Sequence, residues 1–396
     1  MRFIRKSIIG KSLFFLALVS ALLYYAYEYL EISGYSHLPT KWVLYGSLGL
    51  VAFLYLVFVL DIIIPLRRVV KQVKNLLTGK TFQRIQPKTI DEVGVFTHFF
   101  NEITKDLEKI SYDVKERRRM SSELDIASNI QRDVLPKEAP EAPGLDIVAK
   151  TRSAAEVGGD TFEFLQSTDG NQVFIYIGDV TGHGVPSGLI MMMVDTIVTS
   201  MVYQGVSDGQ ALITHANNLL YPRISSRLFM TTVMLRWDKS NQKMYYTGAG
   251  HEHVLVYRHT TEKVDAIPSG GIALGMIPDN SKIAKEMEIP LEVGDCLVLY
   301  TDGITEAKNQ TGEMYGLEKL TESLKKNGYK PSGDSIFDGL TKDFSRFVGE
   351  YVQIDDITMI VIKYVGPGVV TQKAKLTIAK DEAQDGQVKK KNWDWS

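Results

Sequence analysis

Acidic residues stand beside short apolar segments in the middle of the chain, where their carboxylates could meet. Asp160 directly precedes the segment Thr161–Gln166, and Asp179 directly follows the segment Gln172–Gly178. The polar residues 167–171 between the two segments predict a β-hairpin. Because a hairpin returns the chain antiparallel, both carboxylates are expected at the same end of the ribbon.

A pair of carboxylates in this arrangement favours a bound cation. Two carboxylates held close together repel each other, and one of them would have to keep a proton. A divalent cation removes that conflict, and oxygen ligands without cysteine or clustered histidine favour Mg²⁺ or Mn²⁺. Either aspartate alone is also explained as an ordinary turn residue. The prediction therefore depends on acidic residues elsewhere in the chain.

Two further acidic sites occur at the ends of predicted strands. Asp302 follows the apolar segment Asp295–Thr301, and the doublet Asp355-Asp356 precedes the segment Thr358–Tyr364. Carboxylates gathered without a compensating charge are costly to bring together. Two metal ions explain the set, and they would activate a bridging water as a nucleophile at neutral pH.

These motifs together resemble the metal-dependent Ser/Thr protein phosphatases (PPM family), and specifically the bacterial SpoIIE/RsbU-like branch. The shared motifs are Gly158-Gly-Asp160, Gly178-Asp179-Val-x-Gly-His-Gly184, Thr301-Asp-Gly303 and Asp355-Asp356-x-Thr358. Upstream, Ala127-x-x-Ile-Gln131 and Leu135-Pro136 agree as well. The resemblance covers about residues 123–364.

The resemblance implies an α+β fold of four layers, α-β-β-α, with two Mn²⁺ or Mg²⁺ ions at one edge. It implies that the ions are held by Asp160, Asp179, the main-chain carbonyl of Val180, Asp302 and Asp355, which would be catalytic through a metal-bound water. Asp356 is a second possible ligand because of the doublet. Glu163 is another, because it stands where the family often has a further aspartate. His183 is a candidate proton donor to the leaving oxygen, although a histidine between two glycines more often only packs.

The implied reaction is hydrolysis of phosphoserine or phosphothreonine on a regulatory protein, and the branch points to an anti-sigma factor antagonist of the STAS type. One alternative is an inactive signalling adapter of the same fold, against which the complete set of aspartates argues. Another takes Gly158-Gly-Asp-Thr-Phe162 as a damaged GGDEF nucleotide cyclase signature. Asp302 and Asp355 have no place in a cyclase.

The first 66 residues predict two transmembrane helices. Ile8–Leu30 and Trp42–Leu66 are almost wholly apolar, and each is long enough to cross a bilayer, which takes about 20 residues. Lysine and arginine residues precede the first segment and follow the second, whereas residues 31–40 between the segments contain neither. The positive-inside rule then places both termini in the cytoplasm, with the protein in the inner (cytoplasmic) membrane.

The segments 67–115 and 116–138 predict helices that connect the membrane to the phosphatase domain. Apolar positions recur at spacings of four and three on both sides of a connector that ends in Asp91-Glu-Val-Gly94. This pattern resembles a HAMP signalling module, and the resemblance implies a homodimer. A plain amphipathic linker is the alternative. The apolar stripe then resumes out of phase at Met120, and residues 116–138 are predicted to be a linker helix that could transmit a rotation or a change of order.

Composition and the order of elements limit the remaining possibilities. The chain has 396 residues, a net charge of −2 and one cysteine, which argues against a nucleic-acid partner and a disulfide scaffold. In residues 144–365, helices come in pairs between groups of strands, which predicts antiparallel sheets with helices packed outside. Residues 366–396 are polar and are predicted to be disordered.

Overall fold

The structure is a computed structural model, and it divides the chain into two compact units. It describes residues 8–32, 40–78, 85–86, 92–138, 140–350, 353–369 and 375–378. The units are Met1–Arg119 and Met120–Ser396. Helix α5, Glu92–Val134, contains the boundary between them.

The N-terminal unit is helical, and its first two helices fall on the predicted apolar segments. Helix α2 (Ile8–Ile32) and helix α3 (Thr40–Phe58) contact each other. α3 runs through a π-helical turn, η1 (Val59–Ile63), directly into α4 (Ile64–Leu77). Pro65 explains the π turn, because proline lacks an N–H and its ring crowds the carbonyl one turn earlier.

The HAMP-like region contains helix α4, a connector and the first part of α5. Most of the predicted connector, residues 79–84 and 87–91, lies outside the described residues. At its centre, the Ile85 N–H donates to Asn101 Oδ1 (3.1 Å), and Asn101 Nδ2 donates to the Ile85 carbonyl (2.7 Å). The segment predicted as a linker helix, 116–138, is helical up to Val134 and continues the helix before it, because α5 runs unbroken through the charged residues 115–119. A change of heptad phase alters which face is apolar without removing any backbone hydrogen bond.

Among the described residues, one helix is long and apolar enough to cross a membrane, and it is α6 (Val185–Tyr203). Half of its apolar window is buried inside the C-terminal unit, as expected for the core helix of a folded domain. Two shorter apolar helices, Leu13–Tyr29 and Leu48–Phe58, lie within the predicted membrane segments. The pair of membrane spans at the N-terminus therefore stays a prediction.

The C-terminal unit contains two sheets. One sheet has six strands in the order β11-β1-β10-β9-β6-β7, and the other has five in the order β2-β3-β4-β5-β8. The strands are β1 Leu145–Arg152, β2 Thr161–Gln166, β3 Gln172–Val180, β4 Met230–Asp238, β5 Lys243–Ala249, β6 Val254–Arg258, β7 Lys263–Ile267, β8 Glu286–Ile289, β9 Cys296–Tyr300, β10 Ile357–Tyr364 and β11 Lys375–Ile378. Neighbouring strands are antiparallel except β1 and β11.

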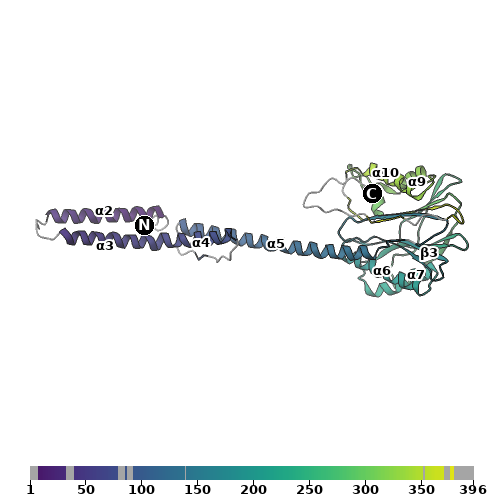
Figure 1. The fold of residues 1–396 in the computed structure, drawn as a ribbon, viewed down its shortest axis with the longest axis horizontal. Helices are drawn as coiled ribbons and strands as arrows, with labels where there is room; N and C mark the ends of the chain where they lie inside the picture. Colours follow the sequence, from purple (N-terminus) through teal and green to yellow (C-terminus); the bar gives the residue numbers. More distant parts are fainter. Residues whose placement is uncertain are drawn as a thin grey trace. The chain divides into compact units, whose positions relative to one another are not determined.

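Helices cover the outer faces of both sheets and complete four layers (Figure 1). α6 and α7 (Gly209–Leu220) contact the five-stranded sheet, while α9 (Gly316–Asn327) and α10 (Gly333–Val348) contact the six-stranded sheet. One apolar core fills the space between the sheets, and a further core lies beneath each helical layer. The predicted α+β sandwich with antiparallel sheets and outer helices is therefore confirmed.

The C-terminal tail departs in part from its prediction. Lys375–Ile378, within the segment predicted to be disordered, forms the edge strand β11 and pairs in parallel with β1 from Val148↔Lys375 to Thr151↔Ile378. The sequence Lys-Leu-Thr-Ile alternates polar and apolar residues, so it can cover the otherwise open edge of the sheet. Residues 379–396 lie outside the described residues.

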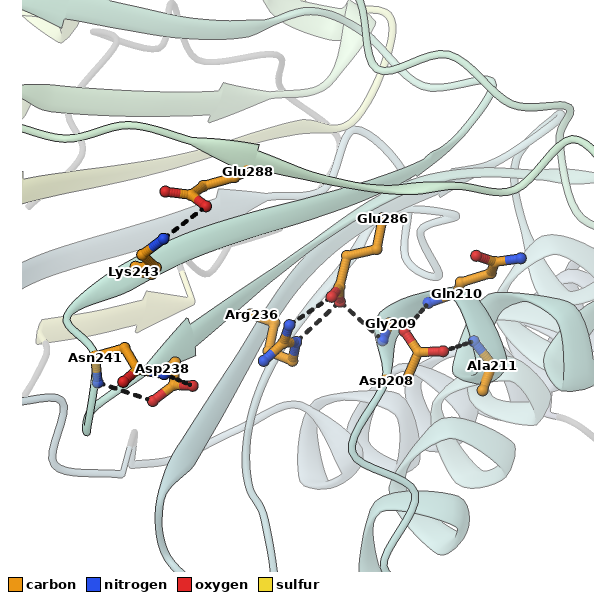
Figure 2. Close-up of polar contacts among 10 residues, drawn as sticks. All are labelled: Asp208, Gly209, Gln210, Ala211, Arg236, Asp238, Asn241, Lys243, Glu286 and Glu288. Atoms are coloured by element: carbon orange, nitrogen blue, oxygen red, sulfur yellow. Dashed lines mark hydrogen bonds and ion pairs between the residues drawn. The ribbon is translucent and has the colours of Figure 1, made fainter.

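Polar contacts tie α7 to the five-stranded sheet (Figure 2). Asp208 caps α7 by accepting hydrogen bonds from the N–H groups of Gln210 and Ala211. Glu286 of β8 binds the guanidinium of Arg236 on β4 with both oxygens and also accepts from the Gly209 N–H. These contacts fix the helix against the sheet whose opposite edge carries β2 and β3.

Candidate metal centre

The β2–β3 hairpin brings Asp160 and Asp179 together, as predicted. Thr161 pairs with Gly178, so the two aspartates stand side by side at the same end of the hairpin. Asp160 is 6% exposed, and its pKa is raised well above the usual range by burial and by the charge of Asp179. A side-chain hydrogen bond between Asp160 and Asp179 opposes the rise in the pKa of Asp179.

Two threonines from the other sheet hold Asp160 in place. Thr301 Oγ1 donates to Asp160 Oδ2 at 2.8 Å, and Thr358 Oγ1 donates to the same oxygen at 2.6 Å. Thr301 follows β9, and Thr358 lies at the start of β10, so the ends of both sheets meet here. Sequence reasoning gave these threonines no role, although each belongs to a motif that carried the resemblance.

Asp302 and Asp355 lie near enough to Asp179 for their charges to act on it. Asp302 opens the one-turn helix α8 (Asp302–Thr305), and burial followed by the charge of Asp355 raises its pKa to about 6. The pKa of Asp179 is raised to about 8 by burial and then by the charges of Asp302 and Asp355. Glu252 and Glu306 add negative charge near Asp302 and were missed by the sequence reasoning.

The two members of the acidic doublet have different surroundings. Asp356 is buried, and it accepts hydrogen bonds from the N–H groups of Ala154 and Gly159, both at 2.7 Å. Burial raises its pKa, while these backbone hydrogen bonds oppose the shift. Asp355 is exposed beside Asp302. Asp355 is thus the carboxylate that is open to an ion, whereas Asp356 anchors the loop before Asp160.

Val180 is the last residue of β3, and His183 lies in the turn that follows. The Val180 carbonyl oxygen faces Gly159, where an added Cβ would lie only 2.7 Å from it. A side chain at position 159 would therefore crowd this oxygen. His183 is exposed in the turn before α6, between Gly182 and Gly184, which both have a positive φ.

Glu163 does not join this group, although the sequence analysis considered it as a ligand. Residues 160 and 163 are separated by an odd number of positions, so their side chains point to opposite faces of the sheet. Glu163 hydrogen-bonds with Asp195 of α6, and its pKa is raised to about 8, chiefly by burial. Asp195 also accepts a hydrogen bond from the Tyr176 hydroxyl at 2.7 Å.

A small cavity opens beside the carboxylates. Its volume is about 100 Å³. Asp355, Glu306 and Lys308 contribute charge to its lining, while Met314, Ile354 and Ile357 contribute apolar surface. Because Asp355 faces both the cavity and Asp302, a polypeptide bound at the carboxylates would have room here for a neighbouring side chain.

The donors at this edge fit a hard divalent cation. They are carboxylate oxygens and one main-chain carbonyl, which is the ligand type that Mg²⁺ and Mn²⁺ prefer. Within the described part of the chain, no three acidic, histidine or cysteine side chains are already closed around one ion position. Instead, burial and neighbouring carboxylates raise the pKa of both Asp160 and Asp179. A bound cation would relieve the repulsion between them.

Much of this chain is similar in sequence to known proteins. Residues 169–365 match the family described as stage II sporulation protein E (SpoIIE). The phosphoserine phosphatase RsbU of Bacillus subtilis is 28% identical over 249 residues, which cover 62% of this chain and 71% of RsbU. The phosphoserine phosphatase RsbP of the same organism is 27% identical over 187 residues, which cover 46% of this chain and 45% of RsbP.

Solved structures share the fold. The SiaA-PP2C domain of Pseudomonas aeruginosa superposes with a TM-score of 0.53 at 21% identity, covering 63% of this chain and 98% of that domain. The RsbU and RsbW domains of a Mycobacterium tuberculosis protein give a TM-score of 0.50 at 22% identity, covering 60% of this chain and 64% of that one. The family match decides between the phosphatase and cyclase alternatives: residues 169–365 form a SpoIIE-family PP2C-type phosphatase domain, which is homologous to RsbU.

Proposed function

We propose that this protein is a metal-dependent protein-serine/threonine phosphatase that hydrolyses phosphoserine or phosphothreonine on a regulatory protein. One observation carries the proposal: Asp179, Asp302 and Asp355 lie near enough for the charges of Asp302 and Asp355 to raise the pKa of Asp179, and that of Asp355 to raise the pKa of Asp302. A phosphate monoester is negatively charged, so uncompensated carboxylates would repel it. The same carboxylates attract it once they hold divalent cations.

In this proposal, two Mn²⁺ or Mg²⁺ ions are held by Asp160, Asp179, the Val180 carbonyl, Asp302 and Asp355. Bound ions supply Lewis-acid activation of water and neutralise charge on the phosphoryl oxygens. Thr301 and Thr358 orient Asp160 by donating to Oδ2 and leave its other oxygen for a ligand. Asp356 holds the preceding loop through Ala154 and Gly159 and has no ligand role.

Substrate binding would use the surroundings of the carboxylates. His183 is exposed near the Val180 carbonyl and can donate a proton to the leaving serine oxygen. The cavity beside Asp355 accommodates a substrate side chain close to the phosphorylated residue. RsbU and RsbP are named phosphoserine phosphatases, which supports a phosphoprotein substrate. The SpoIIE/RsbU-like resemblance favours an anti-sigma factor antagonist of the STAS type.

The N-terminal unit would anchor and control the enzyme. The apolar helices α2 and α3 would cross the inner (cytoplasmic) membrane and leave both termini in the cytoplasm. The HAMP-like segment around α4 and the first part of α5 would form a homodimeric relay to the phosphatase domain. A nearly neutral chain supports no nucleic-acid partner.

The activity is tested with the full chain in detergent micelles. We expect hydrolysis of p-nitrophenyl phosphate and of a phosphoserine peptide with Mn²⁺, and loss of both with a chelator. A folded protein that binds Mn²⁺ but releases no phosphate from either substrate would contradict the proposal. It would favour the alternative of a signalling adapter of the same fold.

The membrane topology is tested separately by cysteine labelling. Cys296 is buried and is the one cysteine of the sequence, so introduced cysteines can be read against a low background. A membrane-impermeant maleimide added to spheroplasts is expected to label Ser36→Cys between the two apolar segments and not Ser396→Cys at the C-terminus. Equal labelling of both positions would contradict two membrane spans with cytoplasmic ends.

A further inference from the structure

Gln131, near the end of α5, binds the loop that carries Asp160. Its side-chain Nε2 donates to the Gly158 carbonyl at 2.7 Å, and its Oε1 accepts from the Gly158 N–H at 3.1 Å. The side-chain amide of Gln131 thus pairs with both the N–H and the carbonyl of Gly158, as the backbone of a neighbouring β-strand would. The side chain is 6% exposed, so water cannot easily replace these bonds.

The same loop is held from its other side by Asp356. Gly158 leaves no room for a side chain, because an added Cβ would lie 2.4 Å from Asp356 Oδ2. Asp356 accepts from Gly159, one residue after the amide contact of Gln131. Asp160 follows directly. The position of Asp160 therefore depends on two anchors, Asp356 directly before β10 and Gln131 on helix α5.

The α5 anchor is built into the core of the C-terminal unit. Ser128 and Leu135, one turn on either side of Gln131, are also buried. Leu135 belongs to the same apolar core as Ile190 and Met191 of α6. On α6, Gly188 lies so close to the Val157 side chain that an added Cβ would be 2.4 Å from it. The end of α5, the Asp160 loop and the start of α6 thus form one tightly packed junction.

We propose that Gln131 is a positioning residue for Asp160, and that through it the end of helix α5 sets the affinity of the site for its divalent cations. The inference rests on the proposed metal-dependent function. A side chain that orients a ligand-bearing loop contributes to metal affinity, and loss of such outer contacts typically weakens binding about 10- to 100-fold. Because α5 is continuous from Glu92, a displacement of this helix end would reach Asp160 through the amide contact.

The test compares Gln131→Met with the wild-type full chain in detergent micelles. Methionine keeps the length and burial of the side chain but removes both hydrogen bonds. We expect Mn²⁺ binding, measured by isothermal titration calorimetry, to weaken about tenfold or more. We also expect hydrolysis of p-nitrophenyl phosphate to recover substantially as Mn²⁺ is raised. A purely structural contact would lower the folded fraction without changing the Mn²⁺ affinity of the folded molecules.

Two further variants supply a control on the same helix and a second test of the Gln131 side chain. Asn129→Leu alters an exposed residue of the same helix and should leave Mn²⁺ affinity unchanged. Gln131→Glu keeps an acceptor for the Gly158 N–H but sets a carboxylate oxygen against the Gly158 carbonyl, so it should weaken Mn²⁺ binding even if Gln131→Met fails to fold. Wild-type affinity in folded Gln131→Met or Gln131→Glu would overturn the role of Gln131. A wild-type protein that binds no Mn²⁺ would instead overturn the proposed function.

Discussion

The β2–β3 hairpin contributes residues to two groups of acidic side chains, and the groups differ in what surrounds them. The edge carboxylates are Asp160, Asp179, Asp302 and Asp355, and the interior group is Glu163, Asp195 and the hydroxyl of Tyr176. Asp160, just before β2, is three residues from Glu163, and Asp179 of β3 is three residues from Tyr176. The pKa of Asp179 and that of Glu163 are each raised to about 8, with burial as the main cause.

The difference lies in how the charge is compensated. In the interior group, Glu163 keeps its proton for Asp195, which also accepts from Tyr176, so hydrogen bonds within the protein complete the group. At the edge, further carboxylates raise the pKa of Asp179, and Asp355 is exposed. A raised pKa alone therefore does not identify a metal site. Several carboxylates that face one open space give the stronger indication.

The largest expected effect is loss of catalysis when an edge carboxylate loses its charge. Asp302→Asn should lower metal-dependent hydrolysis of p-nitrophenyl phosphate by about 10²–10³-fold, because it removes charge that stabilises the transition state through the ion. Asp179→Asn should do the same. Steady-state kinetics across a Mn²⁺ titration measure the effect, and circular dichroism checks the fold.

Asp238→Asn is the matched control for these variants. Asp238 also ends a strand, but it accepts from the N–H groups of Ser240 and Asn241 in a turn away from the edge (Figure 2). It should keep wild-type turnover. If Asp302→Asn retained activity within threefold of Asp238→Asn, the edge carboxylates would not be the catalytic centre.

The adjacent residues Asp355 and Asp356 give the next test of the comparison. Asp356→Asn places an amide where two backbone N–H groups donate, so it should lower the free energy of unfolding by about 2 kcal/mol. Asp355→Asn removes an exposed charge and should leave stability nearly unchanged while it abolishes metal-dependent turnover. Chemical denaturation and phosphatase assays of the two variants should thus give opposite patterns. If both variants lost stability and turnover to the same extent, Asp355 would not be a ligand distinct from the structural anchor Asp356.

The interior group predicts a pH dependence of stability. The unfolded chain releases the Glu163 proton near pH 4.5, and the folded domain releases it near pH 8. Between these values the unfolded state binds fewer protons, so the free energy of unfolding falls as the pH rises. Glu163→Gln keeps a donor toward Asp195 and should remove up to about 1.4 kcal/mol of this fall per pH unit.

Urea denaturation between pH 5 and pH 8 measures this difference. Glu322→Gln, which changes an exposed glutamate on α9, should follow the wild-type dependence. Glu163→Gln should also keep most of its Mn²⁺-dependent turnover, because its side chain points away from the edge. Loss of turnover comparable with that of Asp302→Asn would place Glu163 among the functional residues after all.

Sequence reasoning placed the hairpin and the edge carboxylates because their signals are local. Strand periodicity and the register of a tight hairpin put Asp160 beside Asp179. The sequence did not show which of Asp355 and Asp356 would be the ligand. The two residues have the same side chain, and they differ only in the groups that pack against them. Thr301, Thr358 and Gln131 received no role, because each acts through contacts with residues distant in sequence.

Three edge strands of the fold were likewise not predicted, because they depend on contacts with distant segments. Strands β7, β8 and β11 were missed because each is short, and the burial pattern of β7 and β8 shows mostly exposed or half-buried residues. Long apolar strands such as β3 and β10 were predicted with nearly correct bounds. Edge strands depend on the neighbour that they cover, and a single sequence segment does not contain that neighbour.

The smallest expected effect comes from two glutamates of β8 that extend the comparison to ion pairs. Glu286 is 16% exposed and binds Arg236, whereas Glu288 is 39% exposed and binds Lys243 at 3.0 Å (Figure 2). Glu288→Gln should leave the free energy of unfolding nearly unchanged, because exposed ion pairs are screened by water and salt. Glu286→Gln should cost about 1–2 kcal/mol, since it weakens charge-assisted hydrogen bonds that hold α7 against the sheet. Denaturation of the Glu286→Gln and Glu288→Gln variants at low and high salt distinguishes the two ion pairs. Equal losses in the free energy of unfolding would mean that burial does not determine the strength of paired charges in this domain.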